Sequence, residues 1–278
     1  LGDVYKRQLF SKVRSPYDGV VMKKLIPLLL LVVAMPSWAQ RQFDIEVIIF
    51  KRAVNPEQTA ESWPNSVPEI SMKRVGNFND ASYRQQKGVE MLPASSYELN
   101  PQAQKLKNHA GFKVLLHTAW RQGDGNRYIA PTFHIQAGRD FSGQFNADGS
   151  QKGSDIGTEV IDGVTEESIA KPLYELDGKL QVYVEHYLYA DVKLDLKAPS
   201  VRDVTFEAKP LEFTPTDDTV AEDTVQVGLM EDVTPTVHTE EFLKSYRMDQ
   251  KRRMRSTETH FLDHPLLGMI IQVRRVAQ

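Results

Sequence analysis

The stretch LQVYVEHYLYADVKLDLK, from Leu180 to Lys197, has the clearest pattern in the chain. Apolar residues occupy every even position except 186, whereas polar and aromatic residues occupy the odd positions. Because successive side chains of a strand point to opposite faces of a sheet, this period of two predicts a β-strand with one buried face. At about 3.3 Å per residue, a single strand of this length is unusually long. The pattern therefore predicts a bend or bulge near Ala190-Asp191.

The residues on the N-terminal side of this stretch predict further strands. Asp177-Gly178 is a dipeptide typical of hairpin turns, and such a turn would pair the stretch with residues from about Pro172 to Leu176. Near the start of the chain, QFDIEVIIFK (residues 42–51) first alternates and then becomes apolar on both faces from Ile48 to Phe50. This change predicts a strand that ends under a covering element or in the middle of a sheet.

One short helix is clearly marked. Asn100 is expected to cap it, Pro101 suits its first turn, and Gly111 is expected to end it. Its inward face is predicted to hold Ala103, Leu106 and Ala110.

The remaining pattern favours strands and long loops. Apolar strands are expected at residues 112–121 and 269–276, and residues 53–93 contain four prolines, which predicts a long packed excursion anchored by Trp63 and Phe78. Strands and helices do not alternate along the chain. The predicted fold class is therefore α+β, with a mostly antiparallel β-sheet, one clear short helix and long loops.

Residues 22–39 have the features of an export signal. Met22-Lys23-Lys24 gives a basic start, Leu25 to Ala34 an apolar run, and Ser37-Trp38-Ala39 a small-residue cleavage site. A membrane span needs about 20 apolar residues, so this run is too short for a retained anchor. We therefore expect cleavage after Ala39 and a periplasmic protein without a membrane span in its mature chain.

The same interpretation divides the chain into three parts. Residues 1–21 are read as an upstream or non-native leader, residues 22–39 as the signal, and residues 40–278 as a single domain. The last part holds 28 basic and 35 acidic residues, because the first two hold six of the 34 Lys and Arg and two of the 37 Asp and Glu. This balance argues against a nucleic-acid partner. The absence of cysteine excludes disulfides, a thiol nucleophile and a lipid anchor on cysteine.

An acidic loop is predicted at about residues 198–240. Between Glu212 and Glu240 there are eight acidic residues and no basic one, in a context rich in Thr and Pro. Such a composition buries too little apolar surface to order itself, so a mobile loop is expected. Two interpretations remain open for it, a solvated spacer and a partner-binding arm.

The residues that suggest a metal site are His260, Asp263 and His264, with Glu258 nearby as a base. They would serve a metal-dependent envelope hydrolase. Their spacing differs from the helical H-E-x-x-H zinc motif, and the alternative is that Asp263 and His264 hold a turn ahead of Pro265. Other catalytic signatures and phosphate loops are absent, and His117 and His186 are expected to be core histidines. The prediction is a non-enzymatic protein without a cofactor.

The stronger hypothesis concerns a binding surface. Tyr183, Tyr187 and Tyr189 lie on the polar face of their strand. A later strand, expected to be its neighbour, carries four basic residues on its outward face: Arg247, Lys251, Arg253 and Arg255. Tyrosines stack on sugars, and arginines bind carboxylates bidentately. Peptidoglycan presents both groups. The alternative is that a loop or helix covers the tyrosines and makes them a second core layer.

Three segments carry a resemblance to a known family. RQFDIEVIIFKR (residues 41–52), YVEHYLY (183–189) and RRMRSTETHFLDHPLLGMIIQV (252–273) resemble the CsiV family of periplasmic peptidoglycan-binding proteins of gamma-proteobacteria. The resemblance implies peptidoglycan binding and promotion of cell-wall synthesis through an outer-membrane lipoprotein that activates a class A penicillin-binding protein. It does not imply hydrolysis, and it assigns no binding residues.

The export interpretation is tested by the mass of the exported protein. Protein recovered from the periplasm should have the intact mass of residues 40–278, because the signal is removed after Ala39. Mass spectrometry measures this directly, and a recovered species that retains Leu25 to Ala34 would contradict the prediction.

Overall fold

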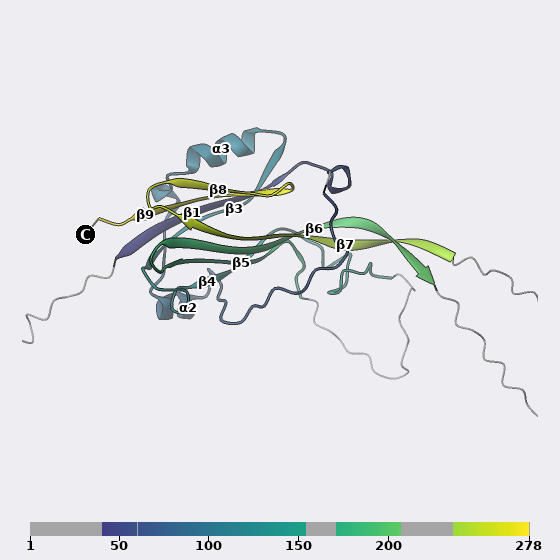
Figure 1. Cartoon of the computed structure of the whole chain (residues 1–278), viewed down its shortest axis with the longest axis horizontal. Helices are drawn as coiled ribbons and strands as arrows, with labels where there is room; N and C mark the ends of the chain where they lie inside the picture. The colour runs from purple at the N-terminus through teal and green to yellow at the C-terminus, as the bar shows by residue number, and fades with distance from the viewer. Residues whose placement is uncertain (1–40, 60, 154–170, 207–235, 278) are drawn as a thin grey trace, which may run out of the picture. The chain divides into compact units, whose positions relative to one another are not determined.

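A computed structural model describes residues 41–59, 61–153, 171–206 and 236–277 (Figure 1). The expected leader and signal, at residues 1–39, lie outside the described residues. So does most of the expected acidic loop. The expected bounds of that loop are wrong at both ends, because residues 198–206 and 236–240 belong to two long paired strands.

The first sheet is built around the strand predicted near the start of the chain. This strand, β1, lies in the middle of the sheet and pairs antiparallel with β3 on one side and β9 on the other. Its central place confirms the expectation drawn from Ile48 to Phe50. The order is β2 (Glu90–Met91), β3 (Phe112–Gly123), β1 (Gln42–Arg52), β9 (Leu267–Arg275) and β8 (Thr259–Asp263).

The second sheet contains the alternating stretch and is also antiparallel throughout. Together the two sheets confirm the α+β, mostly antiparallel fold. The order in this sheet is β4 (Thr132–Asp140), β5 (Tyr174–Val184), β6 (Leu188–Phe206) and β7 (Thr236–Met254).

The alternating stretch is a hairpin and not one bent strand. The chain reverses at residues 185–187, so the predicted bend at Ala190-Asp191 is wrong, and Asp177-Gly178 lies within β5 and not in a turn. The pairing explains the error. Val184 lies opposite Leu188 and Leu180 opposite Val192, so even positions face even positions. The hydrophobic pattern thus continues through the turn and conceals it.

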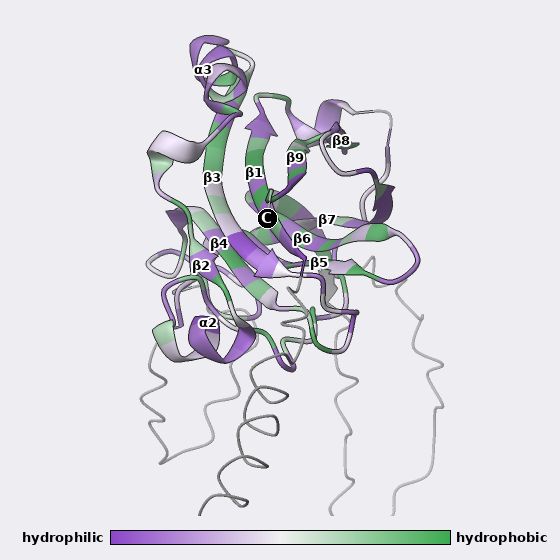
Figure 2. Cartoon of the chain, turned by 90° about the vertical axis from the view of Figure 1, so that its left-hand side faces the viewer, coloured by the Kyte–Doolittle hydropathy of each residue, from purple (hydrophilic) through white to green (hydrophobic). Residues whose placement is uncertain are grey.

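The core lies between the two sheets, which pack face to face (Figure 1). Hydrophobic and hydrophilic residues alternate along the strands in Figure 2, as this arrangement requires. Trp63 and Phe78 pack against the core, as predicted for the excursion after β1. The buried inner residues include Ile45, Val47 and Ile49 of β1, Leu180 and Val182 of β5, Ala190, Val192 and Leu194 of β6, and Ile271 and Val273 of β9.

Two α-helices lie in the described part of the chain, where the sequence predicted one. The predicted helix is α3 (Asn100–Asn108), which covers Ile48 and Phe50 on the outer face of the first sheet. Ala103 is buried and Leu106 half-buried as expected, but Ala110 is exposed and lies beyond the end of the helix. The helix begins at Asn100 with Leu99 as its cap, and His109 caps its C-terminus in place of the expected Gly111.

The unpredicted helix is α2 (Ala81–Lys87). The Asp80 side chain caps its start by accepting a hydrogen bond from the Tyr83 amide, and Gly88 ends it in the left-handed conformation. Short 3-10 turns occur at Pro56–Gln58 and Ala94–Ser96.

The start of α3 is fixed by a buried carboxylate on β1. Glu46 is fully buried and accepts hydrogen bonds from the amides of Glu98 and Leu99, at 2.8 and 2.9 Å. Its oxygens also lie 2.8 Å from His117 Nε2 and 3.0 Å from Arg274 Nη1. The carboxylate therefore ties the cap residue of α3 and the residue before it to β1.

Removing this carboxylate should destabilise the fold strongly. In Glu46→Ala, the Glu98 and Leu99 amides would lose their acceptor and Arg274 its buried carboxylate partner, and breaking a buried charge pair typically costs about 3–5 kcal/mol. Urea unfolding monitored by circular dichroism measures this loss. Glu98→Ala is the matched control, because the Glu98 carboxylate is exposed and 3.5 Å from the same arginine, and exposed pairs contribute about 0–1 kcal/mol. Equal effects would contradict the assignment.

A second pair of variants separates the two tyrosines of the hairpin. Tyr183 is fully buried, whereas Tyr187 at the tip has 49% of its surface exposed. Tyr183→Ala should lower the free energy of unfolding by about 3–5 kcal/mol, in the range of large buried aromatics, and Tyr187→Ala by less than about 1 kcal/mol. Thermal melts of the two variants test this, and a stable Tyr183→Ala protein would contradict the burial.

Candidate ligand-binding site

The three hairpin tyrosines that were predicted to line a binding surface have different environments. Tyr183 is buried and stacks on the half-buried Tyr189 at 5.5 Å between ring centroids. Its hydroxyl has no hydrogen-bond partner among the described residues, yet the proximity of that hydroxyl raises the pKa of Lys251. Tyr187 is exposed, and the guanidinium of Arg253 lies 3.8 Å from its ring centroid. The tyrosines are thus partly a second core layer and partly surface.

The predicted arginines do lie on the strand next to the tyrosines, since β7 pairs with β6 along its whole length. Arg247 binds Asp195 bidentately at 2.8 Å, and this hydrogen bonding raises the pKa of Arg247. Arg253 stacks on Tyr187, and Arg255 is exposed, 3.5 Å from Glu258. Arg253 and Arg255 therefore remain available to a ligand, whereas Arg247 is held by a carboxylate of its own sheet.

The candidate metal ligands do not converge. His260 lies by the backbone of Arg255, Asp263 pairs with Arg52, and His264 is buried against the Trp63 ring at 4.9 Å. Burial lowers the pKa of His264, which favours the neutral ring. Within the ranges that the structure describes, no group of three His, Asp or Glu residues is placed to hold a metal ion.

The turn interpretation of this segment is confirmed for His264. Its ring Nδ1 accepts a hydrogen bond from the Leu266 amide, and its own amide donates to Leu267 O. The other two singled-out histidines differ. His117 is half-buried with its Nε2 on Glu46, as a core histidine should be, but His186 is exposed at the hairpin tip. The expectation for His186 was wrong because the turn at 185–187 was missed.

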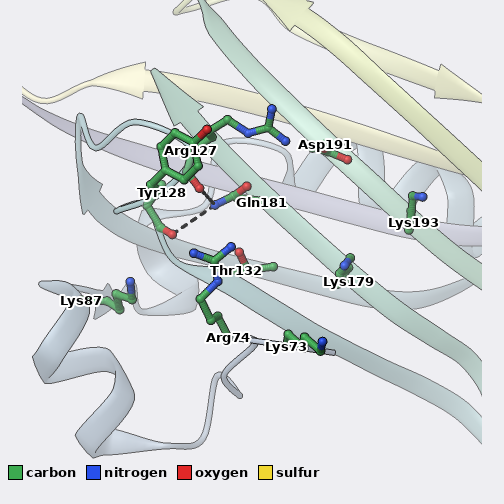
Figure 3. A pocket seen from close by; sticks show the side chains of 11 residues that line it. Lys73, Arg74, Lys87, Arg127, Tyr128, Thr132, Lys179, Gln181, Asp191 and Lys193 are labelled. Carbon is green, nitrogen blue, oxygen red and sulfur yellow. Dashed lines mark hydrogen bonds between the residues drawn. The ribbon is translucent and has the colours of Figure 1, made fainter. Parts of the chain in front are cut away.

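The most distinctive surface feature is a basic pocket on the outer face of the second sheet (Figure 3). Its volume is about 470 Å³. Six of the side chains that line it are cationic and only Asp191 is anionic. The cations are Lys73, Arg74, Lys87, Arg127, Lys179 and Lys193.

The floor of this pocket is formed by the outward parity of β4, β5 and β6. Gln181 lies opposite Thr132 on one side and Asp191 on the other, and Lys179 lies opposite Lys193. These residues face outward because the residues on either side of them along each strand point into the core. The next pair on this face of β5 and β6, after Gln181 and Asp191, is Tyr183 and Tyr189.

One wall is built by α2 and the segment before it. Gly76 pairs with the edge of β4, and the Tyr83 hydroxyl bonds both the amide and the carbonyl of Thr132 at 2.9 Å. Burial raises the pKa of Tyr83. A Cβ at Gly76 would lie 2.2 Å from the Tyr83 ring, so only glycine permits this close approach. The wall carries Lys73 and Arg74 on one side of Gly76 and Lys87 at the end of α2.

The opposite wall is the loop that connects β3 and β4. The Gln181 side chain donates hydrogen bonds to the carbonyls of Arg127 and Ala130, and the Val184 amide donates to Gly125 O. These bonds hold the loop against β5, as the dashed lines in Figure 3 show for Gln181. The loop presents Tyr128, which has 70% of its surface exposed.

The pocket retains an excess of positive charge. Lys193 pairs with Asp249 at 2.9 Å, while Lys87 and Lys179 donate to the carbonyls of Ile129 and Ser71. In the described part of the chain, no carboxylate lies within ion-pair distance of the other three cations, Lys73, Arg74 and Arg127. Such a pocket suits an anionic ligand with carboxylate or phosphate groups.

A second basic pocket, of about 320 Å³, is different in this respect. It surrounds the buried Glu175, which pairs with Lys51 and Lys113. Burial alone would raise the pKa of Glu175, but the hydrogen bonds from Lys51 and from the Arg139 amide outweigh it and lower that pKa. The chain thus supplies an anion to this pocket itself.

Sequence reasoning did not find the larger pocket. The odd parity of Gln181 and Lys193 placed them on the polar face of the alternating stretch, which was the available signal. Lys73, Arg74 and Arg127 lie in segments without periodicity, and nothing local indicates that they meet.

Comparison with known proteins gives one positive result. The searches of curated proteins and of solved structures return no significant match. Among the helices described, none is long and apolar enough to span a membrane. The family model described as "Peptidoglycan-binding protein, CsiV" matches residues 23–276, which is nearly the whole chain. The chain therefore belongs to the CsiV family of peptidoglycan-binding proteins.

Proposed function

We propose that this protein is a non-catalytic binding protein of the cell envelope that holds peptidoglycan on the outer face of its second sheet. The observation that carries this proposal is the basic pocket, with six cations around one acid. Membership of the family indicates the polymer, and the charge of the pocket supports this location for its anionic groups. Export by the signal at residues 22–39 would deliver the protein to the periplasm.

Exposed aromatic side chains on the pocket wall and at the tip of the β5–β6 hairpin complete the proposed surface. Tyr128 on the pocket wall and Tyr187 at the hairpin tip are both exposed, and Arg127 and Arg253 lie against these rings at 5.9 and 3.8 Å. Exposed tyrosines offer a flat apolar face to a sugar ring and a hydroxyl to its oxygens. The glycan would stack on these rings while peptide carboxylates enter the pocket.

The finer role in wall synthesis belongs to this proposal as well. The resemblance that runs through residues 41–52, 183–189 and 252–273 supports promotion of synthesis through an outer-membrane lipoprotein that activates a class A penicillin-binding protein. In that role the protein is an adaptor between polymer and partner. The alternative of a metal-dependent hydrolase has little support, because His264 is packed under Trp63 and does not face His260 or Asp263 across a shared site.

The proposal predicts salt-sensitive binding to purified sacculi that also depends on the exposed rings. The full-length mature protein should co-sediment with sacculi and should be released as salt rises, because ions screen exposed charges beyond about 8–10 Å at physiological strength. Tyr128→Ala with Tyr187→Ala should weaken binding several-fold, at roughly 0.5–1.5 kcal/mol per stacked ring, without lowering the melting temperature.

The matched control for the tyrosines is Phe261→Ala. Phe261 has 46% of its surface exposed, similar to Tyr187, but it lies on β8 of the other sheet. It should sediment like the wild type. Wild-type protein that stays in the supernatant would refute peptidoglycan as the ligand, and equal losses for all variants would refute the location of the aromatic surface.

A further inference from the structure

We infer that the basic pocket recognises the free carboxylates of peptide stems that have not been cross-linked, so that the protein distinguishes new from mature wall material. This inference rests on the proposed function and adds the ligand class and its preferred state. The argument begins with charge. The sugars of the glycan are neutral, and one carboxylate would balance only one of the three pocket cations that lack a carboxylate partner in the described part of the chain, Lys73, Arg74 and Arg127. The pocket therefore fits a ligand with several anionic groups.

The size of the pocket supports a peptide end. A volume of about 470 Å³ lies within the usual range for pockets that enclose small organic ligands and far exceeds the space one ion occupies. Cations reach it from three parts of its lining: the wall formed by α2 and the segment before Gly76, the β3–β4 loop, and the strands of the floor. A ligand with carboxylates at more than one point along its length can contact all three.

The single acid gives the pocket a second kind of selectivity. Asp191 lies on β6 between Gln181 of β5 and Lys251 of β7, and it forms no ion pair among the residues described. Its carboxylate can accept a hydrogen bond from an amine or an amide N–H of the ligand. A peptide that carries both carboxylates and a free amine is complementary to this arrangement.

Cross-linking removes both of these features from the peptides. When two stems are joined, the terminal residue of one stem leaves with its carboxylate, and the amine of the other stem becomes a neutral amide. Each cross-link thus removes one carboxylate that the cations of the pocket could bind and one amine that Asp191 could bind. Uncrosslinked stems, which are most frequent in newly made material, should bind best.

The inference is tested by neutralising the carboxylates of the polymer. Sacculi treated with carbodiimide and ammonium chloride carry neutral primary amides in place of carboxylates, and their glycan is unchanged. Wild-type protein should bind them roughly tenfold more weakly than untreated sacculi, the scale of losing one or two charge-assisted contacts. Equal binding to both would overturn the inference and leave the proposed function intact. Binding to neither would refute the proposed function.

Variants locate the effect in the pocket. Lys73→Gln with Arg127→Gln removes two cations that have no carboxylate partner in the described structure, so the fold should be retained. This double variant should bind untreated sacculi as weakly as the wild type binds amidated sacculi, and amidation should weaken it little further. Lys105→Gln with Lys107→Gln, both exposed on α3, is the matched control and should behave like the wild type. A pocket variant with wild-type binding would overturn the assignment.

The cross-linking preference has its own measurement. Soluble muropeptide monomers should compete with sacculi at lower concentration than their cross-linked dimers, counted per stem. Dimers that compete equally well, or better, would show that the pocket does not read the cross-linking state.

Discussion

The face-to-face packing of two alternating sheets constrains everything else in this protein. Because the even-numbered residues of β5 and β6 must lie against β1 and β9, the odd-numbered residues are left on the outer face. The alternation that buries the even-numbered side chains in the core therefore places Lys179, Gln181 and Asp191 on the outer face. The proposed binding surface is thus the outer face of the sheet whose inner face forms the core.

On most of that outer face, charges are neutralised by neighbours on adjacent strands. Arg247 binds Asp195, and Asp177 lies between His134 and Lys197 at 2.7 and 3.4 Å. Burial alone would raise the pKa of Asp177, but the hydrogen bond from His134 and the charge of Lys197 outweigh it and lower that pKa. The pocket departs from this pattern, since its extra cations come from segments outside the sheet. This unbalanced charge supports the proposal that the pocket binds a ligand.

The strands and the fold class could be predicted from the sequence because burial leaves a local pattern. The central position of β1 was visible in the apolar run from Ile48 to Phe50, but the turn at 185–187 was not, because a pairing of even with even residues leaves the pattern unbroken. The contact that holds the start of α3 could not be predicted, because Glu46 lies more than fifty residues away from the Glu98 and Leu99 amides. The pocket could not be predicted, since Lys73 and Arg127 meet Lys179 only through tertiary contacts. The pocket and the contact at the start of α3 both depend on long-range contacts, which leave no local pattern.

The charge of the pocket and its shape depend on different residues. The close approach of Gly76 to Tyr83 fixes only the shape. Residues 73, 74 and 127 are exposed and can be exchanged one at a time, which would retune the ligand charge without disturbing the scaffold. Any side chain at Gly76 would displace the Tyr83 ring and, with it, the edge of β4. Substitution of the lysines and arginines can therefore change the ligand that this pocket suits, while Gly76 keeps the shape of the pocket constant.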